Sequence, residues 1–306
     1  MSRVTVATCA KVNFGLRVLG RRPDGYHSVE TILQTVGIWD RVDLDLISGE
    51  RKIEISVSEG AAPADESNLC WRAARLLAEQ LKVDQGVSIT LGKSIPVGAG
   101  LGGGSSDAAA TLVGAVRLWG LSVTQEQLEA MSAQVGADVP FFLRGGCCLA
   151  LGRGEKLESL PAPSAWLVVV VPERRVSTAQ AYAALRRGAT RGRRRQLSRP
   201  IKVTIEALKQ GGPAALAAAL HNDFEATPMG GIEDALQAKA ALIEAGCLGA
   251  SLSGSGSGAF GIAADRASAE RIAQQLSSSW DWVRVAPTVP AGEGIVISEA
   301  LEGAAP

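Results

Sequence analysis

The sequence predicts an α+β protein of two domains, a prediction that rests on three observations. The chain has 306 residues, of which 46% are apolar, so it is long enough to bury a large core. Its first part alternates apolar and polar residues as half-buried strands do, and its second half mixes helical and strand-like segments. Because domains usually hold about 100–200 residues, we expect an N-terminal domain over residues 1–160 and a C-terminal domain over residues 161–306. A single α/β unit is the alternative.

The N-terminal segment, residues 4–58, is predicted to form strands. Apolar residues recur at every second position over residues 42–46 and again over residues 53–57, which is the period of a strand with one buried face. The sequence Arg-Pro-Asp-Gly at 22–25 has the composition of a tight turn. We therefore expect this turn to separate the first strands.

Two helices and a strand are predicted to follow. Apolar residues after the N-cap residue Asn68 fall on one helical face, which predicts a helix over residues 68–82. Alternation predicts a strand over residues 87–91. An alanine-rich stretch then predicts a helix over residues 105–119, which Gly120 would end.

A further helix is expected after Thr124, because Thr124 and Gln127 have the spacing of a capping box and Gly136 can end the helix. Residues 137–140 are then expected to form a loop. We interpret His221 as a capping contact at the end of a later helix. In the second half, periodicity predicts helices at 178–187, 213–221, 232–245 and 267–277 and strands at 166–171, 249–253, 258–263 and 282–286.

The composition narrows the classes of protein that fit. The 31 basic side chains balance 31 acidic ones, so the overall charge favours neither nucleic acid nor a membrane surface as a partner. The five cysteines form no CxxC pair and no zinc pattern, which is typical of buried thiols in a reducing compartment. The N-terminus lacks the apolar core of a signal peptide, and no apolar run is long enough to span a bilayer. We expect a cytoplasmic protein; the sequence does not set its oligomeric state.

One segment departs from the overall balance of basic and acidic side chains. Residues 186–199 are rich in arginine but contain no interleaved aromatic residues. A solvated loop is therefore favoured over a nucleic-acid site.

A glycine-rich loop between strand 87–91 and helix 105–119 carries the clearest chemistry. Five of the seven residues 98–104 are glycine. Backbone N–H groups can wrap a phosphate only where no Cβ intervenes, and the start of the next helix adds a positive end. A side chain at Gly102 would thus occupy the space of a phosphate. The residues expected to bind ATP, with the two serine hydroxyls available to phosphate or metal, are Pro96, Val97, Gly98, Ala99, Gly100, Leu101, Gly102, Gly103, Gly104, Ser105 and Ser106.

Other phosphate loops fit less well. Residues 98–103 satisfy G-x-G-x-x-G, but the next helix leads into another helix, where a dinucleotide-binding fold needs a second parallel strand. The Gly-Lys-Ser at 92–94 lacks the spacing of a Walker A loop, and the His-Arg-Asp and Asp-Phe-Gly motifs of protein kinases are absent. A second glycine cluster, residues 254–258, is either a tight hairpin or a second backbone wall that closes on nucleotide or substrate.

The glycine loop resembles the ATP loop of the galactokinase–homoserine kinase–mevalonate kinase–phosphomevalonate kinase superfamily. Further segments narrow the resemblance to the family whose acceptor is a methylerythritol that carries CDP: residues 10–13, 22–27, 136–140 and 252–256. The resemblance implies a two-domain small-molecule kinase fold with the active site in the cleft between the domains. It also implies transfer of a phosphate from ATP, accompanied by Mg²⁺, to the 2-hydroxyl of the CDP-linked methylerythritol, a step of the non-mevalonate isoprenoid pathway.

The same resemblance implies that Lys11 and Asp138 occupy the catalytic positions. Phosphoryl transfer needs the attacking hydroxyl in line and the charge on the γ-phosphate compensated. Asp138 can accept the hydroxyl proton, and Lys11 can orient the hydroxyl while keeping Asp138 ionised. Outside the motif, such an aspartate is typical of a turn and a lone lysine is typical of a solvated surface.

The resemblance further implies a cytosine site. Tyr26 and Tyr182, the only tyrosines, would stack on the two faces of the base, His27 would read its edge, and Asn13 would help to hold the sugar-like end. Core packing is the alternative role for each tyrosine. The runner-up function is a kinase for homoserine, mevalonate or a sugar, which offers no ring to stack on. A nucleotide- or nucleic-acid-binding regulator is the alternative from another class.

Overall fold

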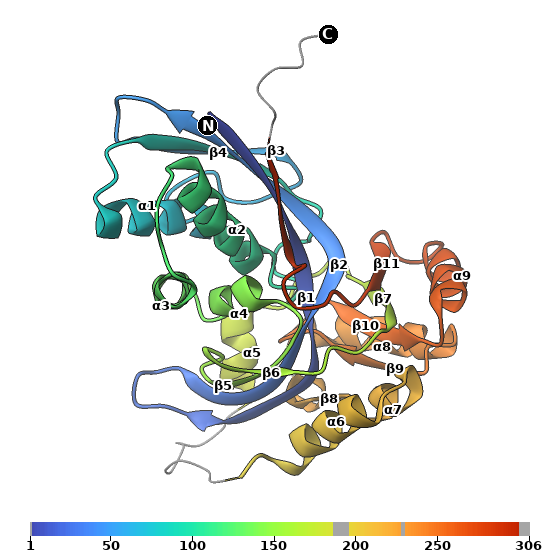
Figure 1. The fold of residues 1–306 in the computed structure, drawn as a ribbon. Coiled ribbons are helices and arrows are strands. Elements are labelled where there is room, and N and C mark those ends of the chain that lie inside the picture. Colours follow the sequence, from blue (N-terminus) through green and yellow to red (C-terminus); the bar gives the residue numbers. More distant parts are fainter. Residues whose placement is uncertain (1, 186–195, 228–229, 300–306) are drawn as a thin grey trace.

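The computed structural model describes residues 2–185, 196–227 and 230–299. They form two β-sheets with helices packed against them (Figure 1). The larger sheet has the strand order β12-β1-β2-β4-β3, with β5 and β6 continuing from β2 and with β8 beside β1. Its strands are β1 (Arg3–Arg21), β2 (His27–Ile47), β3 (Ile53–Glu59), β4 (Gly86–Gly92), β5 (Cys147–Gly152), β6 (Lys156–Leu160), β8 (His221–Asn222) and β12 (Ile295–Glu299).

The long antiparallel pair β1 and β2 is the frame of the molecule. The two strands pair from Arg3 opposite Asp45 to Arg21 opposite His27, and the predicted turn at 22–25 joins them. One half of the pair lies in the sheet with β4 and β3, and the other half pairs with β5. Residues in the middle of β1, including Lys11 opposite Thr35, therefore lie between these two halves of the strand pair.

Helices cover one face of the larger sheet beside β1, β2 and β4 (Figure 1). They are α1 (Leu69–Leu81), α2 (Gly103–Leu118), α3 (Gln125–Val135) and α4 (Val139–Arg144). The first helix begins where the Asn68 side chain accepts a hydrogen bond of 2.9 Å from the Cys70 N–H. The third begins at a complete capping box between Thr124 and Gln127, as predicted. Both starts are fixed by local contacts between the N-cap residue and the first turn of its own helix.

The smaller sheet has the order β11-β7-β10-β9, and all its pairs are antiparallel. Its strands are β7 (Trp166–Val170), β9 (Gly249–Leu252), β10 (Ala259–Ala263) and β11 (Val283–Pro287). The helices of this part are α5 (Thr178–Ala184), α6 (Arg199–Gln210), α7 (Pro213–Ala218), α8 (Ile232–Glu244) and α9 (Arg266–Leu276), with a 3-10 turn at Asp223–Ala226. A separate apolar core joins this sheet to α8 and α9.

Three sequence-based expectations need correction. Only the first two residues of the expected loop 137–140 lie outside a helix, because Pro140 in the first turn of α4 is already compatible with helical geometry. The helix expected at 213–221 ends at Ala218. His221 lies in β8, and its Nε2 is 3.0 Å from Asp223 Oδ1, so it caps no helix. The helix α6 was not predicted, because the arginine-rich segment before it was interpreted as loop.

The expected fold class is confirmed as an α+β arrangement with two sheets. The division of the chain at residue 160 stays a prediction; the last strand β12 returns to pair with β1. Residues 186–195 of the arginine-rich segment lie outside the described residues. No helix within the described ranges is long and apolar enough to cross a membrane.

Candidate active site

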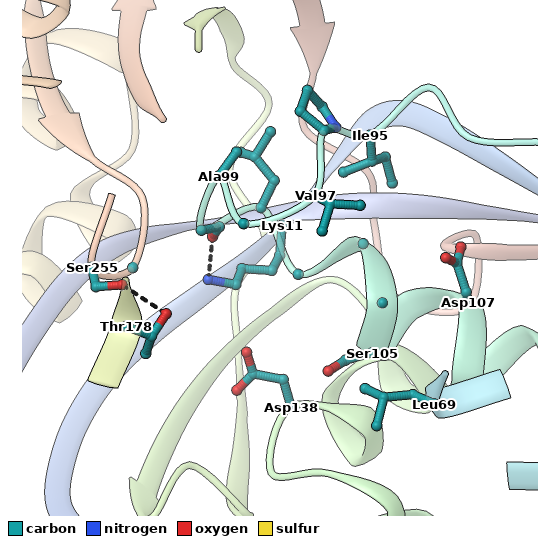
Figure 2. Close-up of a pocket in the computed structure, with 18 of the residues that line it drawn as sticks. Lys11, Leu69, Ile95, Val97, Ala99, Ser105, Asp107, Asp138, Thr178 and Ser255 are labelled. Carbon is teal, nitrogen blue, oxygen red and sulfur yellow. Dashed lines mark hydrogen bonds between the residues drawn. The ribbon is translucent and has the colours of Figure 1, made fainter. Parts of the chain in front are cut away.

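The glycine-rich loop connects β4 to α2 and lines a cavity of about 530 Å³ (Figure 2). Every residue from Pro96 to Ser105 lines it, together with Lys11 of β1 and Asp138 before α4. The loop turns sharply because φ is near +75° at three alternate positions, which only glycine adopts without strain: Gly98, Gly100 and Gly102. The cavity thus combines a folded glycine backbone with the start of a helix, as an anion site requires.

The two serines at the helix start point in different directions. Ser105 lines the cavity. Ser106 is fully buried, and its hydroxyl donates to the Cys9 carbonyl at 2.6 Å and lies 2.6 Å from the Thr8 hydroxyl of β1. Ser106 therefore ties α2 to the sheet, and only Ser105 offers its hydroxyl to the cavity.

Gly102 is essential to the loop for a reason other than the one expected. A Cβ at this position would lie 2.8 Å from the Phe142 ring and 3.0 Å from Cγ of Lys11. The protein itself, and not a phosphate, fills the space that a side chain at Gly102 would need. The positive φ and these contacts together make this position part of the packing between the loop, β1 and α4.

Lys11 extends from the middle of β1 to the edge of the cavity, and only 4% of its surface is exposed. Its ammonium donates hydrogen bonds of 2.7 Å to the Gly100 carbonyl and of 2.7 Å to Asn13 Oδ1. Burial lowers the pKa of Lys11, while the negative charge of Asp138 acts in the opposite direction. Lys11 is thus held in one orientation by neutral groups, and a third N–H remains for a ligand.

Asp138 lies across the cavity from Lys11, at the N-cap position of α4 (Figure 2). Its side chain caps nothing, which leaves the carboxylate free to face the cavity. Lys11 and Asp138 form no ion pair in the described part of the chain. A carboxylate and an ammonium that face the same space without touching leave room for a hydroxyl between them.

Asn13 positions Lys11 and does not face the cavity freely. Its Oδ1 accepts from Lys11 and, at 2.8 Å, from the Gly254 N–H, and its Nδ2 donates to the Thr31 hydroxyl at 2.8 Å. The second glycine cluster therefore connects two strands and lines the cavity, while its closing on nucleotide or substrate stays a prediction. It joins the antiparallel strands β9 and β10, and Gly254 and Ser255 form a wall of the cavity.

A second cavity, of about 990 Å³, adjoins the first and is lined by the three residues expected at a base-binding site, Tyr26, His27 and Tyr182. Tyr26 is 58% exposed, whereas the Tyr182 ring packs 5.0 Å from the His27 ring and 5.0 Å from the Phe224 ring. Burial, together with the charge of Asp138, raises the pKa of Tyr182 to about 12.

His27 and the junction between the cavities complete this site. Burial and the nearby Arg21 lower the pKa of His27, which favours the neutral ring, and a neutral imidazole can both donate and accept a hydrogen bond. Five residues line both cavities: Ser105, Asp138, Arg153, Thr178 and Tyr182. The glycine-rich loop and the aromatic residues therefore line two adjoining cavities, and Asp138 belongs to the lining of both.

Comparison with known proteins places this site in a family. The model described as GHMP kinases N terminal domain matches residues 68–146, and that described as GHMP kinases C terminal matches residues 204–281. A 4-diphosphocytidyl-2-C-methyl-D-erythritol kinase of Pelotomaculum thermopropionicum is 39% identical over 286 residues, which cover 93% of this chain and 98% of the relative. The chain belongs to this family of GHMP kinases. The relative of the same name from Gloeobacter violaceus is 40% identical and covers 90% of this chain and 91% of the relative.

Solved structures agree with the membership of this chain in the GHMP kinase family. A crystal structure of 4-(cytidine 5'-diphospho)-2C-methyl-D-erythritol kinase matches with a TM-score of 0.76 and 33% identity, covering 93% of this chain and 98% of that chain. A homoserine kinase from Cytophaga hutchinsonii matches with a TM-score of 0.71 at 21% identity, over 97% of this chain and 98% of that one, which shows the fold alone. As a GHMP kinase the chain is an ATP-dependent phosphotransferase with an alcohol acceptor, which confirms the predicted enzyme class.

Sequence reasoning missed one charged cluster in this kinase, formed by Lys93, Asp40 and Asp107. The Lys93 ammonium bonds to both carboxylates, at 2.6 Å to Asp107, and Asp40 also accepts from the backbone N–H groups of Ser94 and Ile95. Burial and the charge of Asp40 raise the pKa of Asp107 to about 7. Burial alone would lower the pKa of Lys93, but the two carboxylates raise it, so the cluster keeps Lys93 charged where it lines the cavity.

The sequence contains only a weak indication of this charged cluster. Lys93 occurs in the Gly-Lys-Ser that fails as a Walker A loop, and Asp107 follows the serines of the glycine loop. Neither residue has a local partner, because Asp40 lies in β2, 53 residues away from Lys93 in the sequence.

Proposed function

We propose that this enzyme transfers the γ-phosphate of ATP to the 2-hydroxyl of 4-diphosphocytidyl-2-C-methyl-D-erythritol, in the non-mevalonate pathway to isoprenoid precursors. One observation carries the proposal: the cavity of the phosphate loop and the cavity of Tyr26, His27 and Tyr182 meet at Asp138. A nucleotide in the first cavity and a cytidine group in the second would bring an acceptor hydroxyl to the junction. The names of the relatives support the same substrate.

In this proposal Asp138 accepts the proton of the attacking hydroxyl and Lys11 orients that hydroxyl. Asn13 and the Gly100 carbonyl hold Lys11 in place, so the ammonium needs no reorganisation when negative charge develops. The backbone of residues 98–104 and the start of α2 would hold the ATP phosphates. Most of the rate acceleration would then come from positioning and charge compensation, as expected for phosphoryl transfer.

The cytosine would bind between Tyr26 and Tyr182, with neutral His27 at its edge. Tyr26 is exposed, so its ring is accessible to a base, whereas the Tyr182 ring packs against Phe224. The His27 ring lies close to the Tyr182 ring, so a base stacked on Tyr182 would have His27 beside it. Aromatic stacking contributes on the order of 1–3 kcal/mol per base, which is enough to favour a CDP-linked acceptor over a free polyol.

Mg²⁺ is proposed as the ion that accompanies ATP. Among the described residues, no group of three or more histidine, cysteine or acidic side chains could hold a metal by itself. The cavity fits an ion carried in by the nucleotide, since Mg²⁺ keeps several waters and binds mainly to phosphate oxygens. The hydroxyl of Ser105 is an oxygen ligand that the protein could add. When bound, the ion would compensate the charge on the phosphates.

The cytoplasm is proposed as the compartment. The cysteines Cys9, Cys70, Cys147, Cys148 and Cys247 are all free thiols and all buried. Free thiols persist in reducing compartments, where nucleotide substrates are also found.

An acceptor panel tests the proposed function. Purified enzyme with ATP and Mg²⁺ would be given the CDP-linked methylerythritol, the same polyol without CDP, homoserine or mevalonate, and ADP release would be measured. We expect fast release with the CDP-linked acceptor only, because remote binding energy positions the hydroxyl. Equal turnover of the free polyol would contradict the substrate assignment but leave the kinase class, and turnover of homoserine or mevalonate would identify the runner-up function.

A further inference from the structure

The turn between β5 and β6 carries an arginine, Arg153, at the junction of the two cavities. Arg153 lines both the cavity of the phosphate loop and the cavity of the tyrosines. Its guanidinium carbon lies 5.1 Å from the centre of the Tyr26 ring, in a cation–π contact. None of the sequence motifs contains Arg153, and the proposed mechanism does not use this residue.

The turn that holds Arg153 is well defined. The Arg153 N–H donates to the Glu155 carboxylate at 2.6 Å, and the Gly154 N–H donates to the Leu151 carbonyl at 3.1 Å. A Cβ at Gly154 would lie 3.6 Å from Asp138 Oδ1, so the backbone of the turn is packed next to the proposed base. Arg153 is thus presented to the cavities by a fixed backbone beside Asp138.

The charge of Arg153 is compensated only at a distance: together with Arg22, it helps to lower the pKa of the exposed Asp24 carboxylate. Its guanidinium makes no ion pair within the part of the chain that the structure describes: Glu155 is used by the backbone N–H, and Asp24 is bonded to Arg22 and to the Tyr26 N–H. An arginine that stacks on an aromatic ring keeps the N–H donors at its edge available. A half-buried guanidinium with free donors is a site for a phosphate group.

We propose that Arg153 binds the diphosphate of the acceptor and determines specificity for a phosphate-bearing acceptor over a neutral one. The proposal rests on the proposed function. The contact with Tyr26 places the guanidinium next to the ring expected to stack on the cytosine, which is where the phosphates attached to that nucleoside would lie. The γ-phosphate of ATP is the other anion that could reach this junction, because Arg153 also lines the first cavity.

A double-mutant cycle between protein and ligand tests the proposal. Binding of CDP and of cytidine to the wild type and to Arg153→Gln would be measured by calorimetry. We expect the wild type to bind CDP about tenfold to a hundredfold more tightly than cytidine, the range of hydrogen bonds to a charged group. Arg153→Gln should remove most of this difference and leave cytidine binding nearly unchanged. Arg153→Lys should restore part of it.

Two further arms complete the test. Lys156→Gln removes the same charge from an exposed position just after the turn and should leave the preference for CDP intact. The affinity for ATP should be the same in Arg153→Gln and the wild type. A preference for CDP that survives Arg153→Gln, or a loss confined to ATP, would overturn the proposal. A loss of cytidine and CDP binding in equal measure would also overturn it, because Arg153 would then act only through Tyr26.

Binding of cytidine and CDP to the wild-type enzyme distinguishes the proposed role of Arg153 from the proposed function on which it rests. A wild-type enzyme that binds neither cytidine nor CDP contradicts the cytidine site itself. A wild-type enzyme that binds both equally well keeps the cytidine site and contradicts only the role of Arg153.

Discussion

Lys11, the residue proposed to orient the acceptor hydroxyl, shows how a single charge can be buried beside a cavity. A buried ammonium is costly unless its donors are used, and here two of them are used by an oxygen of Asn13 and by the Gly100 carbonyl. These partners are neutral, so they fix the orientation of Lys11 without cancelling its charge. The nearest compensating charge is Asp138, across the cavity. An acceptor hydroxyl between them would interact with both the ammonium and the carboxylate.

The catalytic pair gives the first prediction. Asp138→Asn and Lys11→Ala should each lower kcat by about 10²–10⁴-fold, the range for a general base or a preorganised charge. ATP affinity should stay nearly constant, because neither residue belongs to the glycine loop. Both variants would be measured with the CDP-linked acceptor at saturating ATP and acceptor.

The double variant is the control for cooperation within the pair. Groups that act as a unit lose their function together, so Lys11→Ala with Asp138→Asn should be scarcely slower than either single variant. If Asp138 only forms a turn, asparagine should replace it well, since both residues make the same side-chain contacts with the backbone. A kcat of Asp138→Asn close to that of the wild type would thus exclude Asp138 as the base.

For single residues, the sequence could indicate which residue types matter but not the direction in which their side chains point. Lys11 and Asp138 stand out only because of the motifs around them. The inward direction of Ser106 depends on Thr8 and Cys9 of a strand far away in the sequence, which no local pattern reveals. The contact of Gly102 with Phe142 is equally non-local.

At the scale of elements, the loop from β4 and the helix α2 act as one unit. The loop carries backbone N–H groups toward the cavity, and Ser106 fixes the helix to β1. The Lys11 N–H also donates to the Leu101 carbonyl at 2.9 Å, so the loop is joined directly to β1. The glycine-rich loop and the middle of β1 are therefore packed as one unit.

A second prediction concerns the surface of this unit. Gly104 is exposed in the first turn of α2, and a Cβ there would lie 3.8 Å from Leu69, an ordinary contact. Gly104→Val should therefore fold normally, but its branches would enter the cavity and weaken ATP binding by about tenfold or more. Calorimetry would give the affinity and thermal unfolding the stability.

Gly104→Ala is the matched control, because it adds one methyl group within ordinary contact distance and should weaken ATP binding much less. Gly102→Val is unsuitable for this purpose, since its side chain would collide with Phe142 and destabilise the fold. Unchanged ATP affinity in Gly104→Val would mean that the nucleotide does not occupy the cavity at the start of α2.

The elements differ in how well local sequence predicts them. The starts of α1 and α3 were predictable because Asn68 and Thr124 cap their own helices. The short strand β8 and the last strand β12 exist only through pairing with β1, and the sequence alone did not reveal them. The helix α6 did carry a local signal, Ser198 followed by Pro200 in the first turn, which the neighbouring arginines obscured.

At the scale of the whole molecule, the proposal assigns a different ligand to each cavity: the nucleotide to one and the acceptor to the other. The N-terminal helices and the glycine loop form one cavity, and the first strand pair together with α5 forms the other. A reaction that transfers a phosphate from a nucleotide to a large acceptor needs a binding site for each, with the reacting groups at the junction. Family membership and fold were predictable from motifs spread along the chain, whereas the shared lining of the two cavities depends on the packing of distant segments.

The central claim is that phosphate is transferred to the 2-hydroxyl of the CDP-linked methylerythritol, and phosphorus NMR of the reaction mixture tests it most directly. We expect one new phosphate monoester signal that grows in proportion to ADP, while the diphosphate signals of the acceptor stay unchanged. Carbon–phosphorus coupling should place the monoester on the methyl-bearing carbon. ADP release without a monoester, or a monoester on another hydroxyl, would contradict the account.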